Sequence, residues 1–309
     1  MQSIVSENLT RIFNGFTAVN DLSFKVNEGD IFGMLGPNGA GKTTTIRILA
    51  AILSPTSGEV YVGGYNTSLE PVKVREIVGV LTENPSLYDR LTPIENLDFF
   101  ARAYGVDDPS KRSAKIKDLL EYFDLWERRS DRVYTFSKGM KQKLAIARAL
   151  VHDPEIVFLD EPTSGLDPRS SKDIRELMEK LSHKENQTIL LSTHRLEDAQ
   201  RLCNQVMIID KGQLLTISSP EALRLQSTGA PTVRIQLTML SNNLIDAAKK
   251  AKQVTSVHVE GNELVVVIED YSATPALVKN IVEAGGMVLS VHQVESTLED
   301  AYLKLVEER

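Results

Sequence analysis

The sequence predicts an α/β protein with a mainly parallel β-sheet, followed by a smaller α+β domain. Up to about residue 225, short apolar runs of strand length alternate with segments of helical spacing. Such alternation indicates a parallel sheet with helices packed on its faces. After Ser218-Ser219-Pro220 the pattern restarts in the order β-α-β-β-α-β, which is the ferredoxin-like plan. We therefore predict domains at 1–225 and 226–309.

The first domain begins with runs in which apolar and polar residues alternate, as they do in β-strands. The predicted strands are Ile4–Phe13, Asp21–Val26, Ile31–Leu35, Glu59–Val62 and Ile77–Leu81. The third strand ends at a glycine-rich turn, after which Lys42–Leu53 has helical spacing. A strand, a glycine-rich turn and a helix in that order favour a phosphate-binding loop.

A helical segment interrupts the alternation of strands and helices. Helical spacing runs from Thr92 to Trp126, with Pro93 suited to a first helical turn. We interpret about residues 84–150 as an inserted helical subdomain. The alternation resumes with helices at Lys138–Val151, Arg169–Leu181 and Leu196–Leu202, and with strands at Ile156–Leu159, Thr188–Ser192 and Val206–Ile209.

The second domain contains four predicted strands, two of them in a hairpin, and three predicted helices. The hairpin turns at Gly261-Asn262, a pair of residues typical of tight turns. Its strands are Ser256–Glu260 and Glu263–Ile268, and the other predicted strands are Val233–Leu237 and Met287–Val291. The predicted helices are Leu244–Ala251, Thr274–Ala284 and Ser296–Glu308.

The bulk composition is that of a globular protein. The 309 residues are 42% apolar and 25% charged, and the net charge of −7 argues against a nucleic-acid partner, which favours a basic surface. The single cysteine cannot form an internal disulfide, which fits a reducing cytoplasm. No apolar stretch approaches the roughly 18 residues that span a bilayer. Any membrane part would therefore belong to another chain.

The segment Gly36-Pro37-Asn38-Gly39-Ala40-Gly41-Lys42-Thr43 matches the pattern G-x-x-x-x-G-K-[ST] in full. Glycines let the backbone bend so that its N–H groups converge on phosphates, and the following helix contributes its positive end. Lys42 can reach the β- and γ-phosphates, and the Thr43 hydroxyl can ligate Mg²⁺. We predict an ATP site that uses this segment together with Thr44. A purely structural glycine turn is the alternative.

A second cluster follows the apolar strand that ends at Leu159. Asp160 and Glu161 come next, and the carboxyl end of a parallel strand faces the crevice where ligands bind. Asp160 can hold Mg²⁺, and Glu161 can accept the proton of a water that attacks the γ-phosphate. Alternatively, the two carboxylates only cap the turn before Pro162.

Three further pieces narrow the prediction to one family. Phe136-Ser137-Lys138-Gly139-Met140-Lys141-Gln142 opens a helix, Ser164-Gly165-Leu166-Asp167 follows Glu161, and His194 follows a strand. With the two clusters above, this set resembles the nucleotide-binding subunits of ABC transporters over roughly residues 3–225. The resemblance implies a fold of the P-loop NTPase class, ATP hydrolysis, and two ATP molecules bound head to tail between two copies of the chain.

The resemblance also implies roles for individual residues. Ser137 and Gly139 belong to the family's signature and face the phosphate on the other copy, Asp167 lies in the D-loop, and His194 is the switch histidine. Lys42, Glu161 and His194 form the expected catalytic set. Phe13 matches the aromatic residue that stacks on adenine, with core packing as the alternative.

The sequence departs from the family pattern at two motifs. Glu83 stands where the family has the Q-loop glutamine, so the expected metal set is Thr43, Asp160 and Glu83. The signature usually reads Leu-Ser-Gly-Gly-Gln, and here Phe136, Lys138 and Met140 differ from it. Lys138 either favours phosphate or faces solvent.

These departures and the small tail resemble the exporter ATPases typified by daunorubicin-resistance proteins. That resemblance implies a separate multi-spanning membrane subunit and a place at the cytoplasmic face of the cell membrane. The partner's coupling helix is expected near Leu87, Tyr88, Leu91, Ile94 and Leu97, unless these residues only form the subdomain's own core. The rival function is a soluble ABC-type ATPase that acts on ribosomes or DNA. The transported substrate and the role of the tail stay open.

Overall fold

A computed structural model describes residues 1–84, 86–227, 231–294 and 297–307. Pro85 and the expected ends of the last helix, Ser296 and Glu308, lie outside these residues. The chain divides into two compact units, Met1–Pro220 and Glu221–Arg309, so the division falls five residues before the expected one. Within the described residues, no helix has both the length and the apolar character needed to cross a membrane.

The first unit contains a six-stranded sheet in the order β10-β9-β3-β8-β7-β6. All neighbouring strands are parallel except β9 and β10, which are antiparallel. The strands are β3 (Ile31–Leu35), β6 (Val78–Leu81), β7 (Ile156–Asp160), β8 (Thr188–Thr193), β9 (Gln205–Asp210) and β10 (Gln213–Ser218). Every residue of β3, β7 and β8 is buried, as expected for central strands covered on both faces. The sheet therefore confirms the predicted parallel core, while β10 was not predicted.

The first two strands belong to a separate antiparallel sheet, in the order β2-β1-β4-β5. Its strands are β1 (Gln2–Phe13), β2 (Phe16–Asn27), β4 (Ser57–Val62) and β5 (Tyr65–Asn66). Asn14 and Gly15 both have positive φ, 46° and 86°, so the chain reverses between Phe13 and Phe16. Strands joined by a two-residue turn are antiparallel. The first unit therefore contains an antiparallel sheet in addition to the predicted, mainly parallel one.

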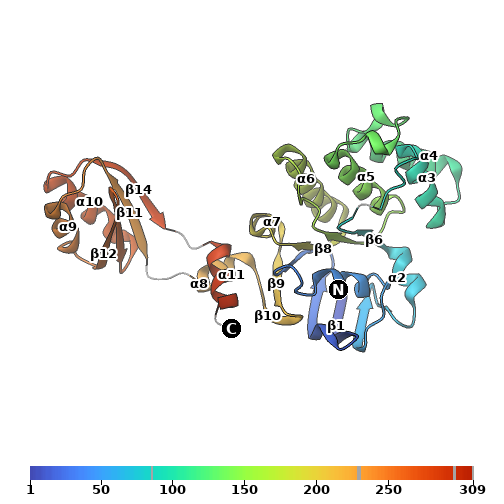
Figure 1. The fold of residues 1–309 in the computed structure, drawn as a ribbon, viewed down its shortest axis with the longest axis horizontal. Coiled ribbons are helices and arrows are strands. Elements are labelled where there is room, and N and C mark those ends of the chain that lie inside the picture. The colour runs from blue at the N-terminus through green and yellow to red at the C-terminus, as the bar shows by residue number, and fades with distance from the viewer. Residues whose placement is uncertain (85, 228–230, 295–296, 308–309) are drawn as a thin grey trace. The chain divides into compact units, whose positions relative to one another are not determined.

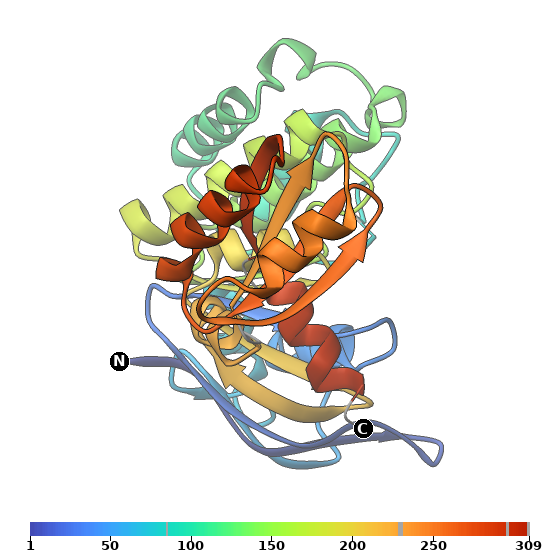
Figure 2. The same cartoon turned by 90° about the vertical axis from the view of Figure 1, so that its left-hand side faces the viewer.

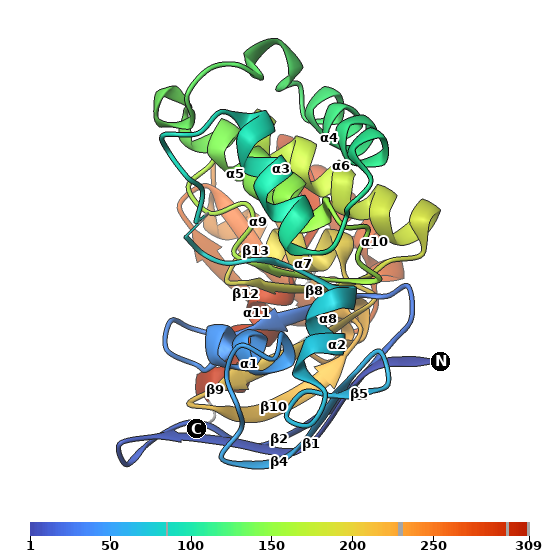
Figure 3. The same cartoon turned by 90° about the vertical axis from the view of Figure 1, so that its right-hand side faces the viewer.

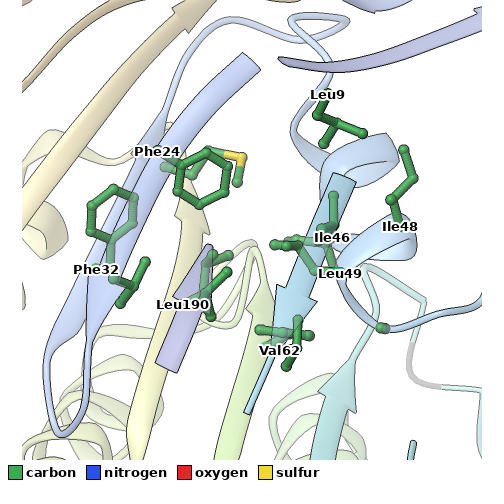
Figure 4. Close-up of a cluster of buried hydrophobic side chains, with 14 of the residues drawn as sticks. Leu9, Phe24, Phe32, Ile46, Ile48, Leu49, Val62 and Leu190 are labelled. Atoms are coloured by element: carbon green, nitrogen blue, oxygen red, sulfur yellow. The ribbon is translucent and has the colours of Figure 1, made fainter. Parts of the chain in front are cut away.

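An apolar core lies between these two sheets and includes residues of helix α1 (Lys42–Leu49). Figure 4 shows Phe24 and Leu9 of the antiparallel sheet, Phe32 and Leu190 of the parallel sheet, and Ile46 of α1 in this cluster. The helix ends four residues before the predicted end because Ala51 adopts a left-handed conformation, with φ 51°. Packing of α1 between the sheets places its first residue, Lys42, at the edge where β3 ends.

Helices cover the other side of the parallel sheet, and Figure 1 shows α5 and α6 there, with the antiparallel sheet on the opposite side. The helical segment contains α3 (Pro93–Ala103), α4 (Pro109–Tyr122), two 3₁₀ turns (Trp126–Arg128 and Val133–Thr135) and α5 (Lys138–Leu150), with α3 and α4 beside α5 (Figure 3). The start of α3 has a capping box, because Thr92 and Glu95 each accept a hydrogen bond from the other's backbone N–H. The remaining helices of this unit are α2 (Pro71–Ile77), which was not predicted, α6 (Pro168–Glu185) and α7 (Leu196–Leu202).

The second unit contains a four-stranded antiparallel sheet in the order β12-β13-β11-β14 (Figure 2). Its elements are β11 (Thr232–Leu237), α9 (Asn242–Lys249), β12 (Val254–Glu260), β13 (Glu263–Ile268), a 3₁₀ turn (Tyr271–Ala273), α10 (Thr274–Glu283) and β14 (Val288–Val294). This is the element order expected from the sequence. Alternate residues of β11 and β13 are buried against α9 and α10 in a second apolar core. Helices α8 (Pro220–Ser227) and α11 (Leu298–Glu307) flank these elements in the chain.

Candidate active site

The loop between β3 and α1 lies at the carboxyl edge of the parallel sheet. At two positions in this loop only glycine fits, because a side chain would collide with neighbouring backbone. A Cβ on Gly36 would lie 2.3 Å from the Ile209 carbonyl oxygen. Gly41 has φ 102°, and its Cβ would lie 2.5 Å from the Ala18 carbonyl oxygen. Neither position accepts an L side chain without moving backbone. The loop is therefore packed tightly between β9 and β2.

Lys42 lies buried at the start of α1 and is held by the loop itself. Its Nζ donates to the carbonyl oxygens of Gly36 at 2.6 Å and Pro37 at 3.1 Å. Burial lowers the pKa of the Lys42 ammonium, and the nearby carboxylates of Glu161, Asp160 and Glu83 oppose this shift. The Lys42 ammonium supplies a positive charge beside the loop, whose backbone N–H groups and following helix start favour an anion.

Thr43 connects this loop to the end of β7. Its Oγ1 donates to Asp160 Oδ2 at 2.8 Å, and Asp160 is only 2% exposed. A hydroxyl and a carboxylate at hydrogen-bond distance are oxygen donors of the kind that Mg²⁺ takes alongside nucleotide phosphates. The described residues contain no group of three or more His, Cys, Asp or Glu residues that could hold a metal. Where Mg²⁺ binds with a nucleotide, its shell consists of one or two carboxylates, phosphate oxygens and several waters, and Thr43 and Asp160 could supply the protein's share here.

Glu161 and His194 come from neighbouring strands and contact each other. His194 Nδ1 lies 2.9 Å from Glu161 Oε1, and the Glu161 backbone N–H donates to the Ser192 carbonyl at 2.9 Å. Glu161 has φ 52°, a left-handed conformation that is uncommon for a residue other than glycine. Its Oε2 is buried and has no hydrogen-bond partner among the described residues. One carboxylate oxygen is thus oriented by the imidazole, and the other is left able to accept a proton.

These residues line one cavity of about 460 Å³. Its described lining consists of Phe16, Ala18, Asn38, Gly39, Ala40, Gly41, Lys42, Thr43, Thr44, Glu83, Asp160, Glu161, Ser164 and His194. The structure brings together most of the residues that the sequence predicts for the site. Glu83, the departure from the family's glutamine, faces the same cavity as Lys42 and Asp160.

The aromatic residue at this cavity is Phe16, whereas the sequence predicted Phe13. Phe13 and Phe16 are opposite each other at the end of the β1–β2 hairpin, and the Arg11 guanidinium lies 4.4 Å from the centre of the Phe13 ring. Phe13 is 38% exposed and Phe16 is 66% exposed. Phe16 is therefore a second candidate, beside Phe13, for the aromatic residue that stacks on adenine, because the hairpin turn places Phe16 along the cavity. Ser164 and Ala18 were also missed, although Ser164 lies inside a motif that the sequence shows.

Besides Phe13, and besides Gly36 and Pro37 at the start of the loop, three predicted residues are missing from the described lining of the cavity. Ser137, Gly139 and Asp167 are not among its described lining residues. Ser137 caps α5 by accepting a hydrogen bond from the Met140 N–H, and Asp167 caps α6 by accepting from Arg169 and Ser170. The hydrogen bonds from Ser170 lower the pKa of Asp167. A Cβ on Gly139 would lie 2.9 Å from Ser170 Oγ, so the starts of α5 and α6 are in contact.

A phosphate-binding loop and a carboxylate pair at the end of the neighbouring strand define the protein as a P-loop ATPase. Residues 19–164 match the family model described as ABC transporter. The chain is 44% identical over 207 residues to the ABC transporter ATP-binding protein NatA of Bacillus subtilis (strain 168), which covers 67% of this chain and 83% of the relative. It is 35% identical over 303 residues to the bacitracin transport ATP-binding protein BcrA of Bacillus licheniformis, covering 98% and 97% of the two chains.

Solved structures show the same fold. A dimeric ATP-binding cassette in a post-hydrolysis state, bound to ADP and Pi, has a TM-score of 0.66 and 25% sequence identity, over 70% of this chain and 98% of that chain. The chain therefore belongs to the ATP-binding subunits of ABC transporters, and it binds and hydrolyses ATP. This confirms the family that the motifs predicted.

Proposed function

We propose that the chain is the energy-coupling subunit of an exporter, and that two copies hydrolyse ATP at their shared interface. One observation carries the proposal. Lys42, Asp160 and Glu161 line the cavity, while Ser137 and Gly139 of the same chain do not. A second copy placed head to tail would supply the missing signature residues. The dimeric cassette with ADP and Pi and the relative named for bacitracin transport support this assignment.

Within this proposal, the residues of one cavity divide the chemistry. Lys42 and the loop amides bind the β- and γ-phosphates. Thr43 and Asp160, with Glu83 facing the same space, would hold Mg²⁺, which supplies charge neutralisation at the phosphates. Glu161 accepts a proton from the attacking water through its unpartnered Oε2. His194 keeps the Glu161 carboxylate oriented through the 2.9 Å contact.

The signature segment has the features of a phosphate-binding site. Phe136 is buried and anchors the segment, whereas Ser137 and Lys138 are exposed. The N–H groups at the start of α5 lie next to the Ser137 hydroxyl, and a helix start favours an anion. The Lys138 ammonium adds a positive charge there. We infer that this surface contacts the γ-phosphate bound by the other copy.

The membrane partner is expected on the surface around α3. Tyr88 is 47% and Phe99 49% exposed, and their rings lie 5.1 Å apart between centroids. A neighbouring groove of about 210 Å³ is lined in part by Ile52, Phe100 and Tyr104. Leu97, in contrast, is fully buried in the helical segment and belongs to its core. A multi-spanning subunit that docks here would hold the chain at the cytoplasmic face of the membrane.

The test of the hydrolytic proposal is the substitution Glu161→Gln. The amide keeps the size of the side chain but cannot accept the proton, so ATP binding should persist while steady turnover is lost. Light scattering should then show a dimer trapped by ATP. The matched control is Glu155→Gln, which removes an exposed carboxylate that precedes the same strand. Unchanged turnover in Glu161→Gln would remove Glu161 from the role of base, and an ATP-bound monomer would contradict the shared site.

The test of the transport proposal is the identity of the partner. The chain should co-purify from detergent-solubilised membranes with a multi-spanning protein, and Tyr88→Asp should abolish this association while leaving ATP binding intact. Recovery with ribosomes alone would favour the rival function, a soluble ATPase that acts on ribosomes or DNA. The net charge of −7 argues against that rival.

A further inference from the structure

The chain segments that follow Glu161 and His194 converge on one buried carboxylate, that of Asp198 on α7. Asp198 is 1% exposed. Its Oδ2 accepts a hydrogen bond from Thr163 Oγ1 at 2.6 Å, and its Oδ1 accepts one from Arg175 Nη1 at 2.8 Å. The Arg195 Nε lies 3.8 Å from Asp198 Oδ2. None of these four residues is among the described residues that line the nucleotide cavity.

Two of the three partners of Asp198 lie close to a functional residue in the chain. Thr163 is two residues after Glu161, and Arg195 directly follows His194. The Arg195 Nη1 also donates to the Thr163 carbonyl at 3.4 Å, so the two loops are connected to each other as well as to the carboxylate. Arg175 extends the network to α6, whose first turn is capped by Asp167.

The contact between Glu161 and His194 needs such support. It is a single hydrogen bond in which the His194 side chain is 54% exposed, and Glu161 holds a left-handed backbone conformation. A non-glycine residue in that conformation persists when its surroundings determine it. A hydrogen bond on Thr163 fixes the direction of the chain as it leaves Glu161, and the same carboxylate restrains the turn that carries His194.

The charges of the network explain why a carboxylate stands at this position. The Arg175 side chain is 16% exposed and its Nε has no hydrogen-bond partner among the described residues. An amide at position 198 would still accept from Thr163, but it would leave the buried guanidinium without a counter-charge. The ionised form is therefore the one that can hold Thr163, Arg175 and Arg195 together.

We propose that Asp198 is a positioning residue for ATP hydrolysis, which sets the distance and orientation between Glu161 and His194 without contacting the nucleotide. This inference rests on the roles proposed above for those two residues. Positioning groups behind a catalytic residue typically change activity by about 10- to 100-fold, and misplacement by about 1 Å has effects of the same order.

The experiment compares Asp198→Asn with Glu197→Gln, an exposed neighbour on the same helix that serves as the control. Turnover per folded molecule in Asp198→Asn should fall about 10- to 100-fold with the dissociation constant for ATP unchanged. The control should match wild type in both. Loss of thermal stability with an unchanged kcat would overturn the proposal, because Asp198 would then be only structural.

A second pair of variants decides the matter if Asp198→Asn does not fold. Thr163→Val keeps the shape of the side chain but removes the donor to Asp198, whereas Thr163→Ser keeps the hydroxyl. We expect kcat to fall in the valine variant and to be largely restored in the serine variant, again at unchanged ATP affinity. Equal kcat in both would overturn the proposal. Glu161→Gln is assayed alongside. Normal turnover in Glu161→Gln would refute the proposed function. Lost turnover in Glu161→Gln with wild-type turnover in Asp198→Asn would refute only this inference.

Discussion

Replacement of Phe16 by alanine tests which aromatic residue of the β1–β2 hairpin receives the adenine. Phe16 lines the cavity and is 66% exposed, so most of its ring is available to a base. Stacking of a base on an aromatic side chain contributes about 1–3 kcal/mol. Since about 1.4 kcal/mol corresponds to a tenfold change, Phe16→Ala should weaken ATP binding by about 5- to 150-fold.

The same substitution should have little effect on folding. Full burial of a phenylalanine side chain contributes about 1.5–3 kcal/mol, and Phe16 is only about one-third buried. We therefore expect a loss of roughly 0.5–1 kcal/mol in the free energy of unfolding. Phe13 should behave in the opposite way. It is nearly two-thirds buried and packs against Arg11, so Phe13→Ala should lower stability by roughly 1–2 kcal/mol and leave ATP affinity unchanged.

Two measurements on each variant separate these effects. Titration calorimetry gives the dissociation constant for ATP, and urea denaturation monitored by circular dichroism gives the free energy of unfolding. The reasoning is refuted if Phe13→Ala weakens binding while Phe16→Ala does not, because the ring nearer to Arg11 would then be the adenine platform.

Three further predictions concern the loop, the D-loop and the thiol. Gly41→Ala should abolish ATP binding, since the new Cβ would meet the Ala18 carbonyl at 2.5 Å and φ is 102°; wild-type affinity by calorimetry would contradict this. Ser170→Ala should raise the pKa of Asp167 toward its ordinary value, and NMR titration of the carboxyl checks this. The lowered pKa of Asp167 contributes stability that is lost as the pH falls through that pKa, so the variant should lose less stability on acidification. The Cys203 thiol, whose pKa is raised by burial, should react with a thiol reagent only after unfolding, so rapid reaction at native conditions would be unexpected.

The fold was predictable from the sequence where the local pattern was sufficient. The buried strands β3, β7 and β8 are continuous apolar runs, and their parallel pairing follows from the helices between them. The antiparallel sheet was harder to foresee, because its strands come from pairing between residues that are distant in the chain, such as Ile4 and Val62. Helix α2 was missed because its seven residues carry little apolar periodicity, and only Val74 is fully buried.

The phosphate loop, the Asp160–Glu161 pair and the family could all be predicted from the sequence, because each motif is a contiguous segment whose backbone and side chains perform their chemistry locally. The place of Phe16 along the cavity could not be read from the sequence, since it depends on the hairpin turn. Only the tertiary structure separated the Ser137 segment from the cavity of its own chain. The Asp198 network likewise joins residues 35 positions apart, Thr163 and Asp198, and no spacing in the sequence encodes a hydrogen bond over that separation.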